Sequence, residues 1–123
     1  MLDLEGRNEG NRRAARPVQV PALHIRVIEG ATTQIVVLAG EVDLAERETL
    51  RDRLHSLGGT VVVDLGAVTF LGSTGLGVLA GARKRLRSDG GDLFVRSPQD
   101  HVRRVLEVTG LDVMLIGAAN TDA

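Results

Sequence analysis

Residues 69–79 read TFLGSTGLGVL and follow an apolar run, VVVDL, at residues 61–65. A β-branched run of this kind predicts a buried strand, and the apolar residues after position 75 recur at helical spacing. Two hydroxyl side chains, Ser73 and Thr74, are therefore expected where the chain enters a helix. A helix N-terminus has free N–H groups and a partial positive charge, which stabilise a hydroxyl cap or, more strongly, a phosphate.

The two hydroxyls also have an ordinary structural interpretation. Serine and threonine are common helix N-caps, so Ser73 and Thr74 could serve only to begin the helix. Gly75 and Gly77 could serve only to let that helix pack close to a sheet. The local pattern leaves both interpretations open, and the rest of the chain has to decide between them.

The composition is that of one globular domain. The chain has 123 residues, of which 43% are hydrophobic and 25% charged, and its formal net charge is -1. A chain of this length can bury a core, and a balanced charge produces no field that attracts nucleic acid. We therefore expect partners to be recognised by local shape and chemistry, with no nucleic acid among them.

Cysteine is absent, which excludes disulfides, thiol nucleophiles and thiolate metal sites. No apolar stretch approaches the roughly 18 residues that span a bilayer, and the N-terminus lacks the apolar core of a signal peptide. We expect a cytoplasmic protein with no membrane insertion.

Charge and hydropathy divide the chain into three parts. Residues 1–17 mix acidic residues with arginines and have no apolar period, which predicts a flexible tail. Residues 18–117 are expected to form the domain, and residues 118–123 a short C-terminal tail of small residues.

The first half of the domain predicts a hairpin followed by a helix. Apolar and polar residues alternate over 23–27, and a continuous apolar run covers 34–39, so two antiparallel strands are expected around a turn at 29–32. Asp43 and Glu46 have the spacing of a capping box. The buried face of the helix that follows is expected to comprise Leu50, Leu54 and Leu57.

The next strand is expected over residues 60–64, with a connection over 65–72 that is longer than usual between a strand and a helix. Long loops in compact domains are often functional. Phe70 and Leu71 are expected to anchor this loop by inserting into the core.

The second half predicts a helix over residues 74–88, with Gly81 as a close-packing point. A strand over 93–95 and a further helix that Ser97 caps are expected next. Gly110 fits the left-handed position that ends a helix, and residues 113–116 are expected to form a last strand. This order predicts an α/β fold whose mixed, mostly parallel sheet has an N-terminal antiparallel hairpin and helices packed on it.

Enzyme motifs are missing from this framework. Residues 72–77, GSTGLG, match neither the phosphate-binding loop with its lysine nor the dinucleotide-binding glycine pattern. Ser73 lacks the nucleophile elbow, and no histidine stands in a triad order. Asp43 and Asp64 are expected near the ends of strands but have no partner that would adapt them to acid–base chemistry. We predict that the protein is not an enzyme and holds no metal or cofactor.

Four segments together resemble the STAS family, the domains shared by sulfate transporters and anti-sigma factor antagonists. In order along the chain they read GEVDLA at 40–45, VDL at 63–65, FLGSTGLGVL at 70–79 and VLEVTGL at 105–111. The resemblance extends over roughly residues 20–117 and implies a STAS-like single domain that acts by binding.

The resemblance also implies a regulatory cycle. Family members that act as anti-sigma factor antagonists bind an ATP-dependent serine/threonine kinase that otherwise holds a sigma factor, and phosphorylation releases the kinase. The family's acceptor hydroxyl precedes the glycine, which makes Thr74 the expected phosphorylation site and Ser73 the second choice. The implied partner-binding residues are Asp43, Gly72, Ser73, Thr74, Gly75 and Leu76.

Position 72 departs from the family pattern, which usually has aspartate before the two hydroxyls where this chain has Gly72. The exchange removes a carboxylate beside the acceptor, although Asp43 matches the acidic residue of another family segment. The alternative hypothesis is therefore a STAS protein-binding subunit of a transport or signalling assembly, not switched by phosphorylation. The oligomeric state is expected to be a monomer or a weak dimer.

Overall fold

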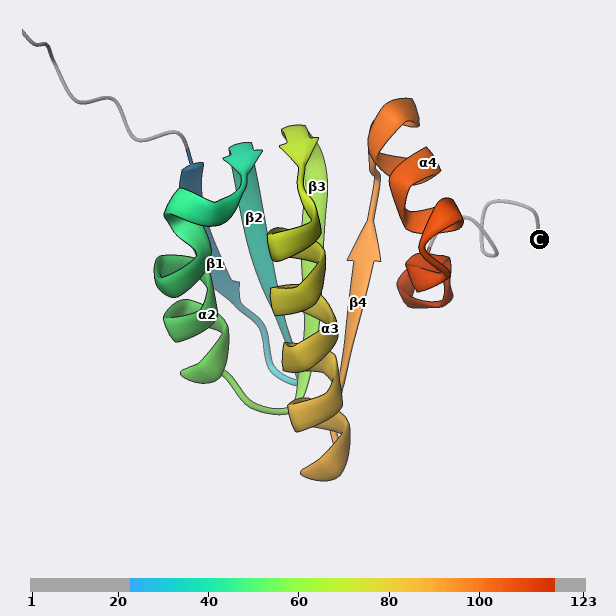
Figure 1. The fold of residues 1–123 in the computed structure, drawn as a ribbon. Coiled ribbons are helices and arrows are strands. Elements are labelled where there is room, and N and C mark those ends of the chain that lie inside the picture. The colour runs from blue at the N-terminus through green and yellow to red at the C-terminus, as the bar shows by residue number, and fades with distance from the viewer. Residues whose placement is uncertain (1–22, 117–123) are drawn as a thin grey trace, which may run out of the picture.

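The computed structural model describes residues 23–116, so the predicted tails at 1–17 and 118–123 lie outside the described part. One mixed sheet has the strand order β1-β2-β3-β4 (Figure 1). Its strands are β1 (Leu23–Glu29), β2 (Thr33–Val42), β3 (Thr60–Leu71) and β4 (Asp92–Arg96). The predicted hairpin is confirmed, since β1 and β2 pair antiparallel while the other neighbours pair parallel.

Two helices connect the parallel strands. The short 3-10 helix η3 (Leu44–Glu46) leads into α2 (Arg47–His55), and α3 (Ser73–Ser88) joins β3 to β4. Both helices lie side by side in front of the sheet in Figure 1. Beyond β4 follow α4 (Asp100–Val108) and a second 3-10 helix, η4 (Leu111–Met114).

The core lies between the sheet and these helices. Alternate strand residues that face the helices are fully buried, among them Val36, Leu38, Val61, Val63, Leu93 and Val95. From the helices, Leu50, Leu54, Leu79 and Leu86 meet them, as the helical period predicts. Within residues 23–116, no helix has both the length and the apolar character needed to cross a membrane.

The prediction of a long loop over residues 65–72 is wrong, because strand β3 continues to Leu71. Two register shifts against β2 each place one extra residue in β3, between Asp64 and Ala67 and again between Val68 and Phe70. Such bulges turn the two-residue period of a strand into an approximate three-residue period, which explains why Leu65, Val68 and Leu71 are the buried positions. Only Gly72 separates the strand from α3.

Three smaller predictions about the second half are also wrong. Helix α4 begins at Asp100 with Gln99 as its N-cap, so Ser97, which has a left-handed φ of 59°, lies before the helix and does not cap it. Gly81 is exposed and has no neighbour that a Cβ would meet, so it is no close-packing point. The last strand is reduced to a single parallel bridge between Leu115 and Val95.

Candidate functional site

The two hydroxyls stand at the start of α3, as the sequence predicts. Gly72 is the N-cap in an extended conformation, so Ser73 and Thr74 are the first two helical residues, and no side chain caps the helix. The interpretation of these hydroxyls as caps is therefore wrong. Ser73 is exposed and Thr74 is half-buried.

The start of α3 is held tightly against the end of β2. The Gly72 N–H donates a hydrogen bond of 2.9 Å to the Val42 carbonyl oxygen. Gly75 is buried on the same strand end, where a Cβ would lie 2.5 Å from Val42 Cγ1 and 3.1 Å from its carbonyl oxygen. Leu76 is buried in the core. Gly75 and Leu76 are therefore buried residues that fix the position of the helix start and of its hydroxyls. Asp43 and Ser73, by contrast, lie on the surface.

Asp43 places its carboxylate beside Gly72. A Cβ on Gly72 would lie 2.9 Å from Asp43 Oδ1 and 3.1 Å from Phe70 Cε2. The predicted capping box is wrong, because Asp43 makes no side-chain cap and instead accepts a hydrogen bond from the Glu46 N–H through its backbone oxygen, at 3.1 Å. The Asp43 carboxylate thus occupies the space next to position 72.

Two apolar side chains that the sequence did not assign to the site are exposed at this end of the sheet. Phe70 is 46% exposed, so its predicted insertion into the core is wrong, and Leu44, directly after Asp43, is 66% exposed. The second bulge in β3 turns Phe70 outward while Leu71 stays buried. For Leu44 a signal existed, since it does not share the helical spacing of Leu50 and Leu54.

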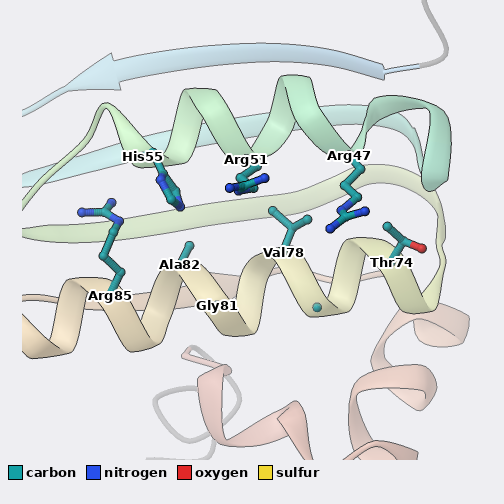
Figure 2. Close-up of a pocket in the computed structure, with 9 residues that line it drawn as sticks. Arg47, Arg51, His55, Thr74, Val78, Gly81, Ala82 and Arg85 are labelled. Carbon is teal, nitrogen blue, oxygen red and sulfur yellow. The ribbon is translucent and has the colours of Figure 1, made fainter.

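A basic groove separates α2 from α3. It encloses about 590 Å³ and is lined by Arg47, Arg51 and His55 of α2 and by Thr74, Gly77, Val78, Gly81, Ala82 and Arg85 of α3. The three α2 residues are spaced four apart, which places them on one face of the helix. Figure 2 shows them directed toward α3, with Arg47 and Thr74 at one end, where the Thr74 methyl group faces Arg47 and the hydroxyl oxygen points away from it.

The arginines along the groove differ in their hydrogen-bond and ion-pair partners. Arg85 donates hydrogen bonds of 2.9 Å and 3.0 Å to the carbonyl oxygens of Leu54 and Leu57, which fixes the end of α2 to α3. Arg51 pairs with Glu48 at 3.3 Å on the helix surface. Among the described residues, no ion pair is assigned to Arg47 at the end near Thr74.

Asp64, the other carboxylate expected near a strand end, lies in the middle of β3 and away from this site. It accepts hydrogen bonds from Arg96 Nε at 2.9 Å and from the Gly66 N–H at 2.8 Å. Partial burial acts to raise the pKa of Asp64, but these two partners outweigh it and hold the pKa below its ordinary value. The side chain is a structural link between β3 and β4.

Comparisons with known proteins agree with this fold. The family model described as "Mlab, STAS domain" matches residues 25–117. The anti-sigma-B factor antagonist of Bacillus subtilis is 34% identical over 87 residues, which cover 68% of this chain and 80% of that protein. The protein of the same name from Listeria monocytogenes is 33% identical over 94 residues, covering 72% of this chain and 82% of that one.

A solved structure described as an anti-sigma factor antagonist from Mycobacterium paratuberculosis superposes with a TM-score of 0.70 at 28% identity. The superposition covers 81% of this chain and 91% of that one. The chain belongs to the STAS domain family, and within it to the anti-sigma factor antagonist type.

Proposed function

We propose that this protein is a cytoplasmic anti-sigma factor antagonist that binds a serine/threonine kinase acting as an anti-sigma factor and releases it on phosphorylation of Thr74. The observation that carries the proposal is the surface at the start of α3. There, Ser73 and Thr74 follow Gly72 without capping the helix, the exposed Phe70 ring lies beside Gly72, and Leu44 is exposed directly after Asp43. Apolar side chains exposed together are typical of protein-binding surfaces.

The chemistry of release follows from the position of Thr74. The threonine hydroxyl oxygen forms a bond to the γ-phosphorus of ATP, the bond to the bridging oxygen breaks, ADP leaves and the hydroxyl proton passes to a base of the kinase. The start of a helix stabilises the new dianion. A partner surface packed over the same spot would instead have to desolvate that charge, which weakens binding without refolding the antagonist.

A second function is a constitutive binding subunit that phosphorylation does not switch. Two observations favour it: Gly72 replaces the acidic residue usual before the hydroxyls, and the matching family model bears the description "Mlab, STAS domain". Gly72 has an extended backbone that any residue can adopt, so the exchange is not required by the turn. The Asp43 carboxylate beside Gly72 supports the switched function, because it supplies a negative group at the same place.

The test is affinity capture from cells with the wild type, Thr74→Ala and Thr74→Asp, followed by mass spectrometry of the bound proteins. The proposal predicts that the wild type and Thr74→Ala retain one ATP-binding kinase and that Thr74→Asp loses it. Incubating the purified kinase and ATP with the wild type, Thr74→Ala and Ser73→Ala then identifies the acceptor by intact mass. A partner that Thr74→Asp still retains, with no mass increase, would favour the constitutive subunit.

A further inference from the structure

The basic groove between α2 and α3 is not needed for any step of the proposed cycle, yet one end of it is lined by Thr74, the residue that the cycle modifies. Its ionisable lining residues are Arg47, Arg51, His55 and Arg85, and no acidic residue among those described lines it. Such a surface has a positive potential that favours an anion.

Among the groove's arginines, the one near Thr74 is the most available to bind an anion. Arg85 is committed to the end of α2 through two carbonyl oxygens, and Arg51 pairs with Glu48. Arg47 is the first residue of α2, and Figure 2 shows its guanidinium extended into the groove on the side of the Thr74 methyl group. A guanidinium binds phosphate oxygens through two parallel N–H groups, a geometry that a single ammonium cannot match.

We infer that Arg47 binds the phosphate on Thr74, so that phosphorylation links the start of α2 to the start of α3. The inference rests on the proposed function, because it concerns the modified form of the same hydroxyl. By this inference, the side chain that binds the phosphate belongs to the antagonist itself, and the phosphate lies in the groove.

The two neighbouring hydroxyls should differ in this respect. Thr74 lines the groove and is half-buried, whereas Ser73 is exposed and does not line it. Rotation about the Thr74 Cα–Cβ bond places the oxygen where the methyl group now faces Arg47, which brings a phosphate on Thr74 to that guanidinium, while a phosphate on Ser73 remains in solvent. Two acidic residues lie before α2, Asp43 with its carboxylate beside Gly72 and Glu46 directly before Arg47, and their charge opposes that of Arg47 for either phosphate.

The experiment uses the full 123-residue chain with the phosphate installed during synthesis, as phosphothreonine at position 74 or phosphoserine at position 73. Each form is made with the wild-type sequence, with Arg47→Gln, and with Arg53→Gln as the matched control. Arg53 is an exposed arginine of the same helix that does not line the groove. The second ionisation of the phosphate is followed by phosphorus NMR.

A free phosphate ester has a second pKa of about 6, and a bound guanidinium lowers such a value by about one unit. We expect this lowering for phosphothreonine 74 in the wild type and in Arg53→Gln, and its loss in Arg47→Gln. Phosphoserine 73 should respond to neither substitution. Thermal unfolding of every form shows whether each variant is folded.

An unchanged pKa of phosphothreonine 74 in the folded Arg47→Gln chain would overturn the inference, as would an equal response from phosphoserine 73. Because no kinase takes part, this outcome is separate from that of the proposed function. A chain that no cellular kinase phosphorylates contradicts the proposed function and leaves the NMR result standing.

Discussion

Gly75 lacks a side chain because α3 begins directly against the end of β2. An alanine there would bring its Cβ within 2.5 Å of Val42 Cγ1 and 3.0 Å of Leu71 Cδ1. We expect Gly75→Ala to lower the free energy of unfolding by about 1–3 kcal/mol, since overpacking a close contact forces neighbouring groups to shift. Urea denaturation measures the change.

Gly77 is the matched control two residues further along α3. A Cβ there meets nothing within 4 Å, so Gly77→Ala should raise the free energy of unfolding by about 0.5–1 kcal/mol through the better helix propensity of alanine. If both alanines prove equally stabilising, the close packing of Gly75 is contradicted.

A substitution at Phe70 is expected to weaken partner binding more than it lowers the stability of the fold. Nearly half of Phe70 is exposed, so Phe70→Ala should lower the free energy of unfolding by only about 1 kcal/mol, less than at a fully buried position. If the proposed partner packs on this surface, the same change should weaken its binding about tenfold or more, as aromatic contacts often do. Calorimetric titration with the captured kinase measures this effect.

The control for Phe70 is Val108→Ala, since Val108 is 77% exposed on α4 and belongs to no part of the proposed surface. It should leave binding unchanged. A kinase that binds Phe70→Ala as tightly as the wild type would place its docking surface elsewhere.

At the scale of elements, Arg85 joins the two helices that form the groove. Its guanidinium donates to the carbonyl oxygens of Leu54 and Leu57 at the end of α2, where the Leu54 oxygen also accepts from backbone N–H groups such as that of Leu57, at 3.2 Å. We expect Arg85→Gln to cost about 1–3 kcal/mol, because hydrogen bonds from a charged donor are lost. Hydrogen exchange should become faster for amides near residues 54–57.

Lys84 provides the control on the same helix, because its side chain is exposed. Lys84→Gln should leave exchange at the end of α2 unchanged. Equal exchange in the Arg85 and Lys84 variants would show that Arg85 does not hold the helices together.

At the scale of the whole molecule, two carboxylates connect β4 to its neighbours and make stability depend on pH. Asp64 pairs with Arg96 at 2.9 Å, and Asp92 with Arg83 at 3.0 Å. Burial acts to raise both pKa values, but hydrogen bonds from backbone N–H groups and the arginines hold both below the ordinary value of 3.8. The unfolded chain therefore binds protons first as the pH falls.

Because the folded pKa values are lowered, this contribution is complete above pH 3.8 and is lost as the pH falls from there through the folded values. We expect Asp64→Asn to reduce stability at pH 7 by about 1 kcal/mol and to flatten the decline in acid. Urea midpoints between pH 7 and pH 2.5 measure both effects. Asp52→Asn, at an exposed position of α2, should cost about 0.5 kcal/mol or less at pH 7.

Strand β3 shows where prediction from the sequence failed. Its first five residues have the apolar pattern of a buried strand and were predicted as such. Its second half was taken for a loop because bulges replace the two-residue period, and their position depends on pairing with β2. Gln99 and His101 of the α4 segment brace this half through the carbonyl oxygens of Gly66 and Thr69, contacts that lie more than 30 residues apart in the chain.

The sequence by itself determined the family, the order of strands and helices, the antiparallel hairpin and the place of the two hydroxyls at the start of a helix, because these depend on local periodicity and on short motifs. Only the tertiary structure decided that the hydroxyls cap nothing, that Phe70 and Leu44 are exposed, and that Arg47 and Thr74 line the same groove. These features arise where segments distant in the chain pack together, and the spacing of residues along one segment carries no information about its neighbours in space.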